Sequence, residues 1–165
     1  MALDLSLGMT KNGWEANVIS LLDVDEFTDA PHSDVSRESL MPMDSYRWPR
    51  VVPALGRSLR EAVSRAQPDA VVSHGPTAAI VLAQAKISPP PLQVFHGNTT
   101  FLRGTTVKDR AMTLWEKRSF RALGGRAIAV SRAIAEKIHQ HFGSAAHVQT
   151  ILNGVDLGLF GPSPT

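Results

Sequence analysis

The sequence contains no cysteine, a single tyrosine and no long hydrophobic run. Without cysteine the chain cannot form a disulfide bond or a thiolate metal site, which fits a reducing compartment. No apolar run approaches the roughly 18 residues that a membrane-spanning helix needs. The first residues lack a basic leader and include Asp4 within their apolar stretch, unlike a signal peptide. These absences predict a cytoplasmic protein.

The excess of charge is also small. Lys and Arg number 17 against 15 Asp and Glu, which gives a formal net charge of +2. A general nucleic-acid-binding protein concentrates more positive charge than this, so we expect no nucleic-acid partner. The hydrophobic fraction of 43% and the charged fraction of 19% are typical of a globular domain. At 165 residues the chain is long enough for one domain with its own core.

Strand-like and helix-like segments alternate from Pro68 onward. Short apolar runs predict strands at 69–73, 91–96, 127–130 and 147–152, with helices at 76–86, 105–123 and 132–142 between them. Ser131 is a suitable N-cap, and Gly143 is suited to end the last helix. Strands separated by helices of this length predict an α/β fold, a Rossmann-like parallel sheet with helices on both faces.

The first third of the sequence is less regular. It predicts a helix at 2–12, a strand at 15–22, a long loop at 23–52 and an amphipathic helix at 53–66. A doubly wound domain begins with a strand that lies in the middle of the sheet, whereas this sequence begins with a helix. The central strand is therefore expected to be absent.

Three predicted strands end in polar or turn residues, in the stretches "VVSHG", "VFHG" and "ILNG". In open parallel sheets, ligands bind beyond the carboxyl ends of the strands. The pattern thus predicts that three neighbouring strands bring His74, His96 and Asn153 to one edge of the sheet, where helix N-termini also point and favour phosphate. A lone histidine is more often a packing residue than a catalyst, so the ligand site rests on the three residues together.

Residues 69–160 resemble the first domain of a family-4 glycosyltransferase, a retaining nucleotide-sugar enzyme of GT-B architecture. The stretches that carry the resemblance are "PDAVVSHGPTAAIVLAQ", "PLQVFHG", "WEKRSFRALGGRAIAVS" and "ILNGVDLGLF". The resemblance implies an acceptor-side domain at 1–158, followed at 159–165 by the start of an interdomain linker. It also implies transfer of a sugar from a nucleotide-sugar donor to an acceptor hydroxyl, with retained configuration.

The resemblance places His96 at the catalytic cleft, where it would contact the donor sugar. An imidazole suits this role because it can donate a hydrogen bond and titrates near neutral pH. Substrate-binding residues are expected at His74, Gly97, Thr99, Thr100, Arg103, Asn153 and Gly154. For the two threonines, capping of a helix or turn is the alternative. For Asn153 and Gly154 the alternative is that they shape the interdomain turn. No carboxylates cluster in the sequence, so no metal site is expected. The resemblance implies no cofactor, because the nucleotide sugar is a substrate.

The sequence also departs from the family. A complete member begins with a strand and a glycine-rich turn, and no such strand precedes Ala2. The second domain, in which the family binds the nucleotide, is missing at the C-terminal end. We therefore expect no transferase activity from this chain alone. The gap in the sheet predicts pairing with a supplied segment, a homodimer or a rearranged sheet.

The acceptor implied by the resemblance is a glycan or a lipid-linked molecule. Basic residues on the helix predicted at 105–123 would then contact the inner face of an anionic membrane. They are Lys108, Arg110, Lys117, Arg118 and Arg121, against the acidic residues Asp109 and Glu116. An ordinary solvated helix face is the alternative.

Two further functions stay open at this point. One is a non-catalytic binding or assembly module, a split or degenerate transferase half. The other is a different Rossmann-like nucleotide-binding protein, such as a dehydrogenase or a flavodoxin-like protein, although no G-x-G-x-x-G follows any predicted strand. A hydrolase with Ser, His and Asp as its catalytic residues has less support still, because the sequence has no G-x-S-x-G motif.

Overall fold

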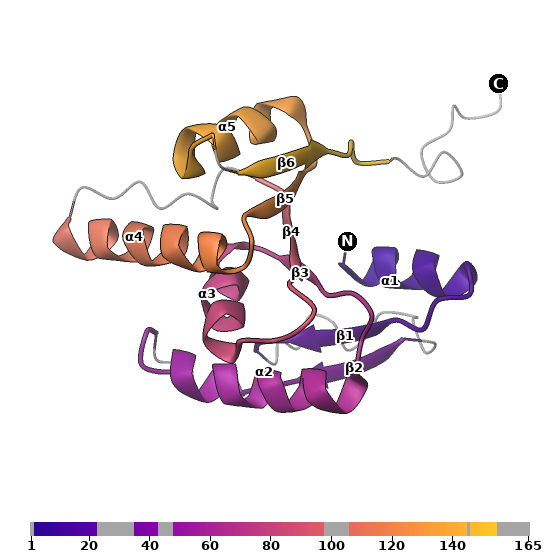
Figure 1. Ribbon diagram of the computed structural model, residues 1–165. Helices are drawn as coiled ribbons and strands as arrows, with labels where there is room; N and C mark the ends of the chain where they lie inside the picture. The colour runs from indigo at the N-terminus through magenta and orange to yellow at the C-terminus, as the bar shows by residue number, and fades with distance from the viewer. Residues whose placement is uncertain (1, 23–34, 43–47, 98–105, 145, 155–165) are drawn as a thin grey trace, which may run out of the picture.

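The computed structural model is an α/β structure in which helices alternate with parallel strands (Figure 1). It describes residues 2–22, 35–42, 48–97, 106–144 and 146–154. The elements are α1 (Ala2–Lys11), β1 (Asn17–Ser20), β2 (Ser36–Ser39), α2 (Val52–Ala66), β3 (Val72–His74), α3 (Pro76–Ala85), β4 (Leu92–Phe95), α4 (Val107–Ala122), β5 (Arg126–Ala129), α5 (Arg132–Phe142) and β6 (His147–Thr150).

The strands form two separate parallel sheets. One has two strands in the order β1-β2, and the other has four in the order β3-β4-β5-β6. Because sequential parallel strands are joined by right-handed crossovers, α3, α4 and α5 are expected on the same face of the larger sheet. Figure 1 shows α3 and α4 on the left of these strands. The predicted Rossmann-like α/β class is confirmed.

Two hydrophobic clusters stabilise the fold. The first lies between α2 and α3, includes Leu55 and Val81, and is contacted by Ile19 from β1. The second lies between the larger sheet and the helices α4 and α5. Its aromatic centre is Phe120 stacked on Phe142, with ring centroids 4.0 Å apart, and Phe95 of β4 meets both rings at their edges.

Trp48, which precedes α2, stacks on Trp115 of α4 with ring centroids 6.0 Å apart. This contact joins the N-terminal part of the chain to the helix that covers the larger sheet.

The ends of α4 and α5 follow from local sequence. Thr106 caps α4 in a capping box: its side chain accepts a hydrogen bond from the backbone N–H of Asp109, and the Asp109 carboxylate accepts one from the backbone N–H of Thr106. Ser131 caps α5 through the N–H of Ile134, and α5 ends at Gly143 with φ 88°, as predicted.

One expectation about local structure was wrong. The segment 23–52, predicted as a loop, contains β2. All four side chains of β2 are exposed, so its sequence "SRES" shows no hydrophobic alternation. The helix predicted at 105–123 is confirmed as α4, and its apolar residues Val107 and Leu114 are 84% and 50% exposed. The buried residues of this region are instead Glu116, Ser119 and Phe120 of α4 and the C-cap residue Leu123.

None of the helices in the described ranges is long and apolar enough to span a bilayer.

Candidate functional site

His74 and His96 meet at the carboxyl ends of two neighbouring strands. His74 is the last residue of β3, and His96 follows the last residue of β4. Nδ1 of His74 lies 2.7 Å from Nε2 of His96, within hydrogen-bond distance. The rings stack with centroids 5.0 Å apart and an interplanar angle of 12°. The prediction that β3 and β4 bring these two histidines together is therefore confirmed.

Strand alternation places the pair on the sheet face opposite α4 and α5. Phe95 of β4 points into the cluster beneath these helices. Because successive side chains of a strand point to opposite faces, Val94 and His96 point away from the helices. His74 pairs in register with Val94 and so shares that face. The histidines thus lie at the strand ends on a face that α4 and α5 do not cover.

The electrostatics of the pair favour the neutral rings. Burial lowers the pKa of His74, and a charge on His96 would lower it further. Burial also lowers the pKa of His96. Two imidazolium rings at this separation would repel each other, and two protonated nitrogens facing one another could not form a hydrogen bond. At neutral pH we therefore expect two neutral rings, joined by one hydrogen bond between the facing nitrogens.

The four nitrogens of the pair have different surroundings. The facing nitrogens, Nδ1 of His74 and Nε2 of His96, lie within hydrogen-bond distance of each other. Nδ1 of His96 is buried and has no hydrogen-bond partner among the described residues. The side chain of His74 is half-buried. In the described part of the chain, its Nε2 is not a buried atom that lacks a hydrogen-bond partner.

The other predicted site residues are less closely associated with the pair. Gly97 is half-buried, directly after His96. Thr99, Thr100 and Arg103 lie outside the described residues.

The expectation that the third strand of the site neighbours the other two was wrong. Asn153 and Gly154 are exposed and follow β6, which is separated from β4 by β5. Because all four strands are parallel, Asn153 follows the carboxyl end of its strand, as the histidines do. No contact joins it to either histidine among the described side chains.

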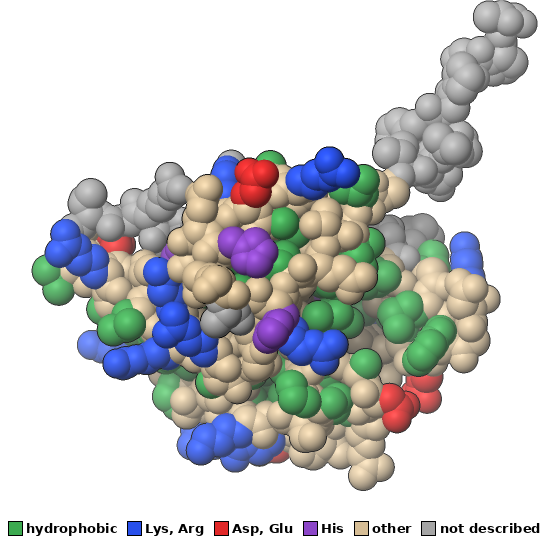
Figure 2. Space-filling view, turned by 45° about the horizontal axis from the view of Figure 1, so that its top comes forward, with side chains coloured by type: hydrophobic (Ala, Val, Ile, Leu, Met, Phe, Trp, Pro, Cys, Tyr) green, Lys and Arg blue, Asp and Glu red, His purple; other side chains and the backbone are tan. Residues whose placement is uncertain are grey.

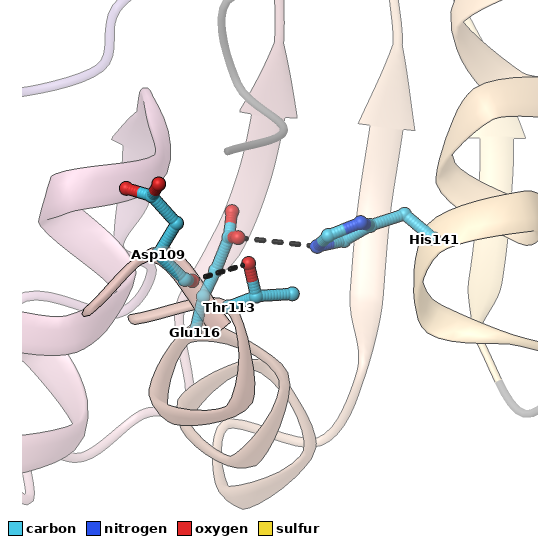
Figure 3. A network of polar contacts seen from close by, with 4 residues as sticks. All are labelled: Asp109, Thr113, Glu116 and His141. Atoms are coloured by element: carbon cyan, nitrogen blue, oxygen red, sulfur yellow. Dashed lines mark hydrogen bonds and ion pairs between the residues drawn. The ribbon is translucent and has the colours of Figure 1, made fainter. Parts of the chain in front are cut away.

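A second polar pair, which the sequence analysis did not find, lies between α4 and α5. Oε2 of Glu116 is 3.1 Å from Nε2 of His141, and the two side chains are 2% and 13% exposed. Figure 3 shows them pointing toward one another from the two helices. Oε1 of Glu116 is buried without a partner in the described ranges. The spacing of Glu116, Phe120 and Leu123 is the signal that could have identified this buried helix face.

Neither described cavity contains the histidine pair. One, of about 200 Å³, lies between the β1–β2 sheet and α2 and includes Glu38 and Arg65 in its lining. The other, of about 660 Å³, includes Arg60 and Lys86. We assign the candidate site to the histidine pair because two imidazoles meet there at the carboxyl ends of parallel strands, where ligands bind in open sheets. No group of three potential metal ligands occurs among the residues that the structure describes.

Comparison with protein families gives a match over nearly the whole chain. The profile of Glycosyltransferase Family 4 matches residues 1–159. A search of curated proteins found no match. The parallel α/β arrangement is consistent with one Rossmann-like half of the GT-B architecture. The match and the fold lead to one conclusion: the chain belongs to glycosyltransferase family 4.

Proposed function

We propose that this chain forms the acceptor-side half of a retaining glycosyltransferase, which transfers a sugar from a nucleotide-sugar donor to an acceptor hydroxyl. The observation that supports this most directly is the contact between His74 and His96 at the carboxyl edge of a parallel sheet in a family-4 chain. Sugars bind through hydroxyl groups that both donate and accept hydrogen bonds, and an imidazole N–H can donate to a hydroxyl oxygen. The resemblance assigns the catalytic contact to His96.

The chemistry requires a donor held against the acceptor, and in the GT-B architecture the two substrates meet between two domains. We therefore propose that the isolated chain binds the sugar portion of a substrate weakly and does not turn over. Thr99, Thr100, Arg103, Asn153 and Gly154 remain candidates for further acceptor contacts.

Saturation-transfer NMR on the purified chain tests this function. The probes are methyl glycosides and nucleoside diphosphate sugars with uridine, guanosine or adenosine. We expect saturation of sugar protons, and we expect it to disappear in the double variant His74→Phe/His96→Phe. Saturation confined to the nucleotide, unchanged in that variant, would favour a different nucleotide-binding protein. Robust sugar transfer by the chain alone would contradict the proposed need for a second domain.

The exposed face of α4 supports a second proposal, contact with an anionic membrane that supplies a lipid-linked acceptor. Arg110, Arg118 and Arg121 are exposed together with Val107 and Leu114. Glu116, counted in the sequence as a balancing charge, is buried against His141. The outward face therefore combines positive charge with apolar side chains, as interfacial helices do. Figure 2 shows blue and green side chains interspersed along the left of the molecule.

A flotation assay with phosphatidylglycerol and phosphatidylcholine vesicles tests the membrane contact. We expect the chain to float with the anionic vesicles only, and Arg118→Glu to reduce the floated fraction. Arg57→Glu, on the exposed side of α2, makes the same charge change at a different surface and should leave flotation unchanged. Equal loss in both variants would indicate a response to net charge alone, against a role for α4.

Self-association stays a prediction. Within the described residues, β1 pairs with β2 and β3 pairs with β4, but β1 and β3 do not pair with each other. Unpaired strand edges favour association. We propose that an edge of this kind joins two copies or accepts a supplied segment. A monomer by light scattering over a wide concentration range would contradict the homodimer.

A further inference from the structure

The position of His96 in the pair has a consequence for ligand binding. Its Nε2 faces Nδ1 of His74 at 2.7 Å, and its Nδ1 is buried without a partner in the described chain. Neither nitrogen of His96 is therefore free to meet a ligand in this arrangement. The accessible nitrogen of the pair is Nε2 of His74, which lies on the far side of the half-buried ring from His96.

The buried nitrogen also indicates which ring carries which proton. If His74 donated to His96, then Nδ1 of His96 would carry a proton and be a buried N–H without an acceptor. If His96 donates from Nε2, its Nδ1 is instead an unprotonated acceptor. Buried N–H groups without a partner are rarer in proteins than acceptors without one. The second arrangement therefore has the lower free energy, and it leaves the proton of His74 on its outward Nε2.

We propose that His74, and not His96 as the resemblance implies, is the ligand-contacting member of the pair, and that His96 is a positioning residue that fixes the tautomer of His74. In this arrangement Nε2–H of His74 donates a hydrogen bond to a ligand oxygen, either a sugar hydroxyl or a phosphate oxygen. The inference rests on the proposed function for the class of ligand. The tautomer itself does not depend on that function.

The tautomer is measured on the free chain by long-range ¹H–¹⁵N NMR of the histidine rings. We expect a protonated Nε2 and an unprotonated Nδ1 on His74, and the same pattern on His96. His96→Phe, which keeps a ring but no donor, should let His74 exchange between its two tautomers. A proton on Nδ1 of His74 in the unsubstituted chain, or a single unchanged tautomer in His96→Phe, would overturn the positioning role.

Ligand contact is measured in the same spectra during titration with methyl α-glucoside and, separately, with inorganic phosphate. One of the two probes, the sugar or the phosphate, should match the ligand that the site binds. We expect that probe to shift the Nε2–H signal of His74 most strongly. His74→Phe should weaken that binding about fivefold, the effect of one lost hydrogen bond. Binding that shifts the nitrogens of His96 and survives His74→Phe would overturn the assignment of His74. Failure of both probes to shift either ring, with the expected tautomers present, would contradict the ligand class of the proposed function and the contact, and would leave the positioning role supported.

Discussion

Two polar pairs in the described part of the chain each contain a histidine, and they differ in partner, burial and place in the fold. His74 and His96 lie at the ends of β3 and β4, where burial lowers the pKa of both rings and leaves the pair neutral. Glu116 and His141 lie between two helices, with the carboxylate almost completely buried. A polar pair that closes a helix interface contributes mainly to stability, whereas a pair at strand ends has a nitrogen left for a ligand. Residue type alone would not separate these roles.

The largest effect is expected at the helix interface. His141→Phe leaves both carboxylate oxygens of buried Glu116 without the imidazole, and a buried unpaired carboxylate is costly. We expect the free energy of unfolding to fall by about 3 kcal/mol, measured by urea denaturation. The double variant His141→Phe/Glu116→Leu should recover much of this loss. A loss below about 1 kcal/mol would mean that the pair contributes no more than an exposed one.

A smaller change of opposite sign is expected at Gln93 of β4. Its side chain is 2% exposed, and neither polar atom has a partner in the described chain. Gln93→Leu removes a buried unpaired amide at similar volume, so stability should rise by about 1 kcal/mol. The same urea titration measures it. Destabilisation instead would show that the amide forms hydrogen bonds in solution.

A still smaller effect on the free energy of unfolding is expected when the pH is lowered. Because burial lowers the pKa of both histidines of the strand-end pair, the unfolded chain binds protons more readily near the ordinary histidine pKa of about 6.5. Stability from the neutral pair is therefore present above that pH and decreases as the pH falls through it, until the folded chain also binds protons. Urea midpoints between pH 8 and pH 5 measure the decrease. The double variant His74→Phe/His96→Phe should show a shallower decrease, and an identical profile would contradict the assignment.

The smallest effect on stability is expected for His74→Phe alone. The ring stack is retained and one hydrogen bond at a half-buried position is lost, which corresponds to about 1 kcal/mol or less. Thermal unfolding provides the measurement, with His141→Phe as the comparison. If His74→Phe destabilises as strongly as His141→Phe, the strand-end pair is also a structural element, and the distinction between the two pairs fails.

Much of the fold and part of the site could be predicted from sequence. The parallel α/β class followed from alternating apolar runs and helix caps such as Ser131, and the meeting of His74 with His96 followed from the position of both at strand ends. These features depend on local pattern and on the general geometry of parallel sheets.

The features that were missed depend on packing between distant segments. β2 has exposed side chains throughout, so no periodicity marked it. Glu116 lies among basic residues in the sequence. In the structure it is buried and contacts His141, which lies 25 positions away. The order of the strands, which separates Asn153 from the histidines by β5, is likewise not encoded in any short motif.

The stacked indoles of Trp48 and Trp115 provide a spectroscopic probe of the packing of α4 against the segment before α2. Two nearby chromophores couple excitonically, so this pair should give a circular dichroism couplet that vanishes when α4 separates from the segment before α2. Of the chain's three tryptophans, the remaining one, Trp14, is 60% exposed, and its fluorescence should be quenched by iodide. The two signals together distinguish local detachment of α4 from global unfolding without any added label.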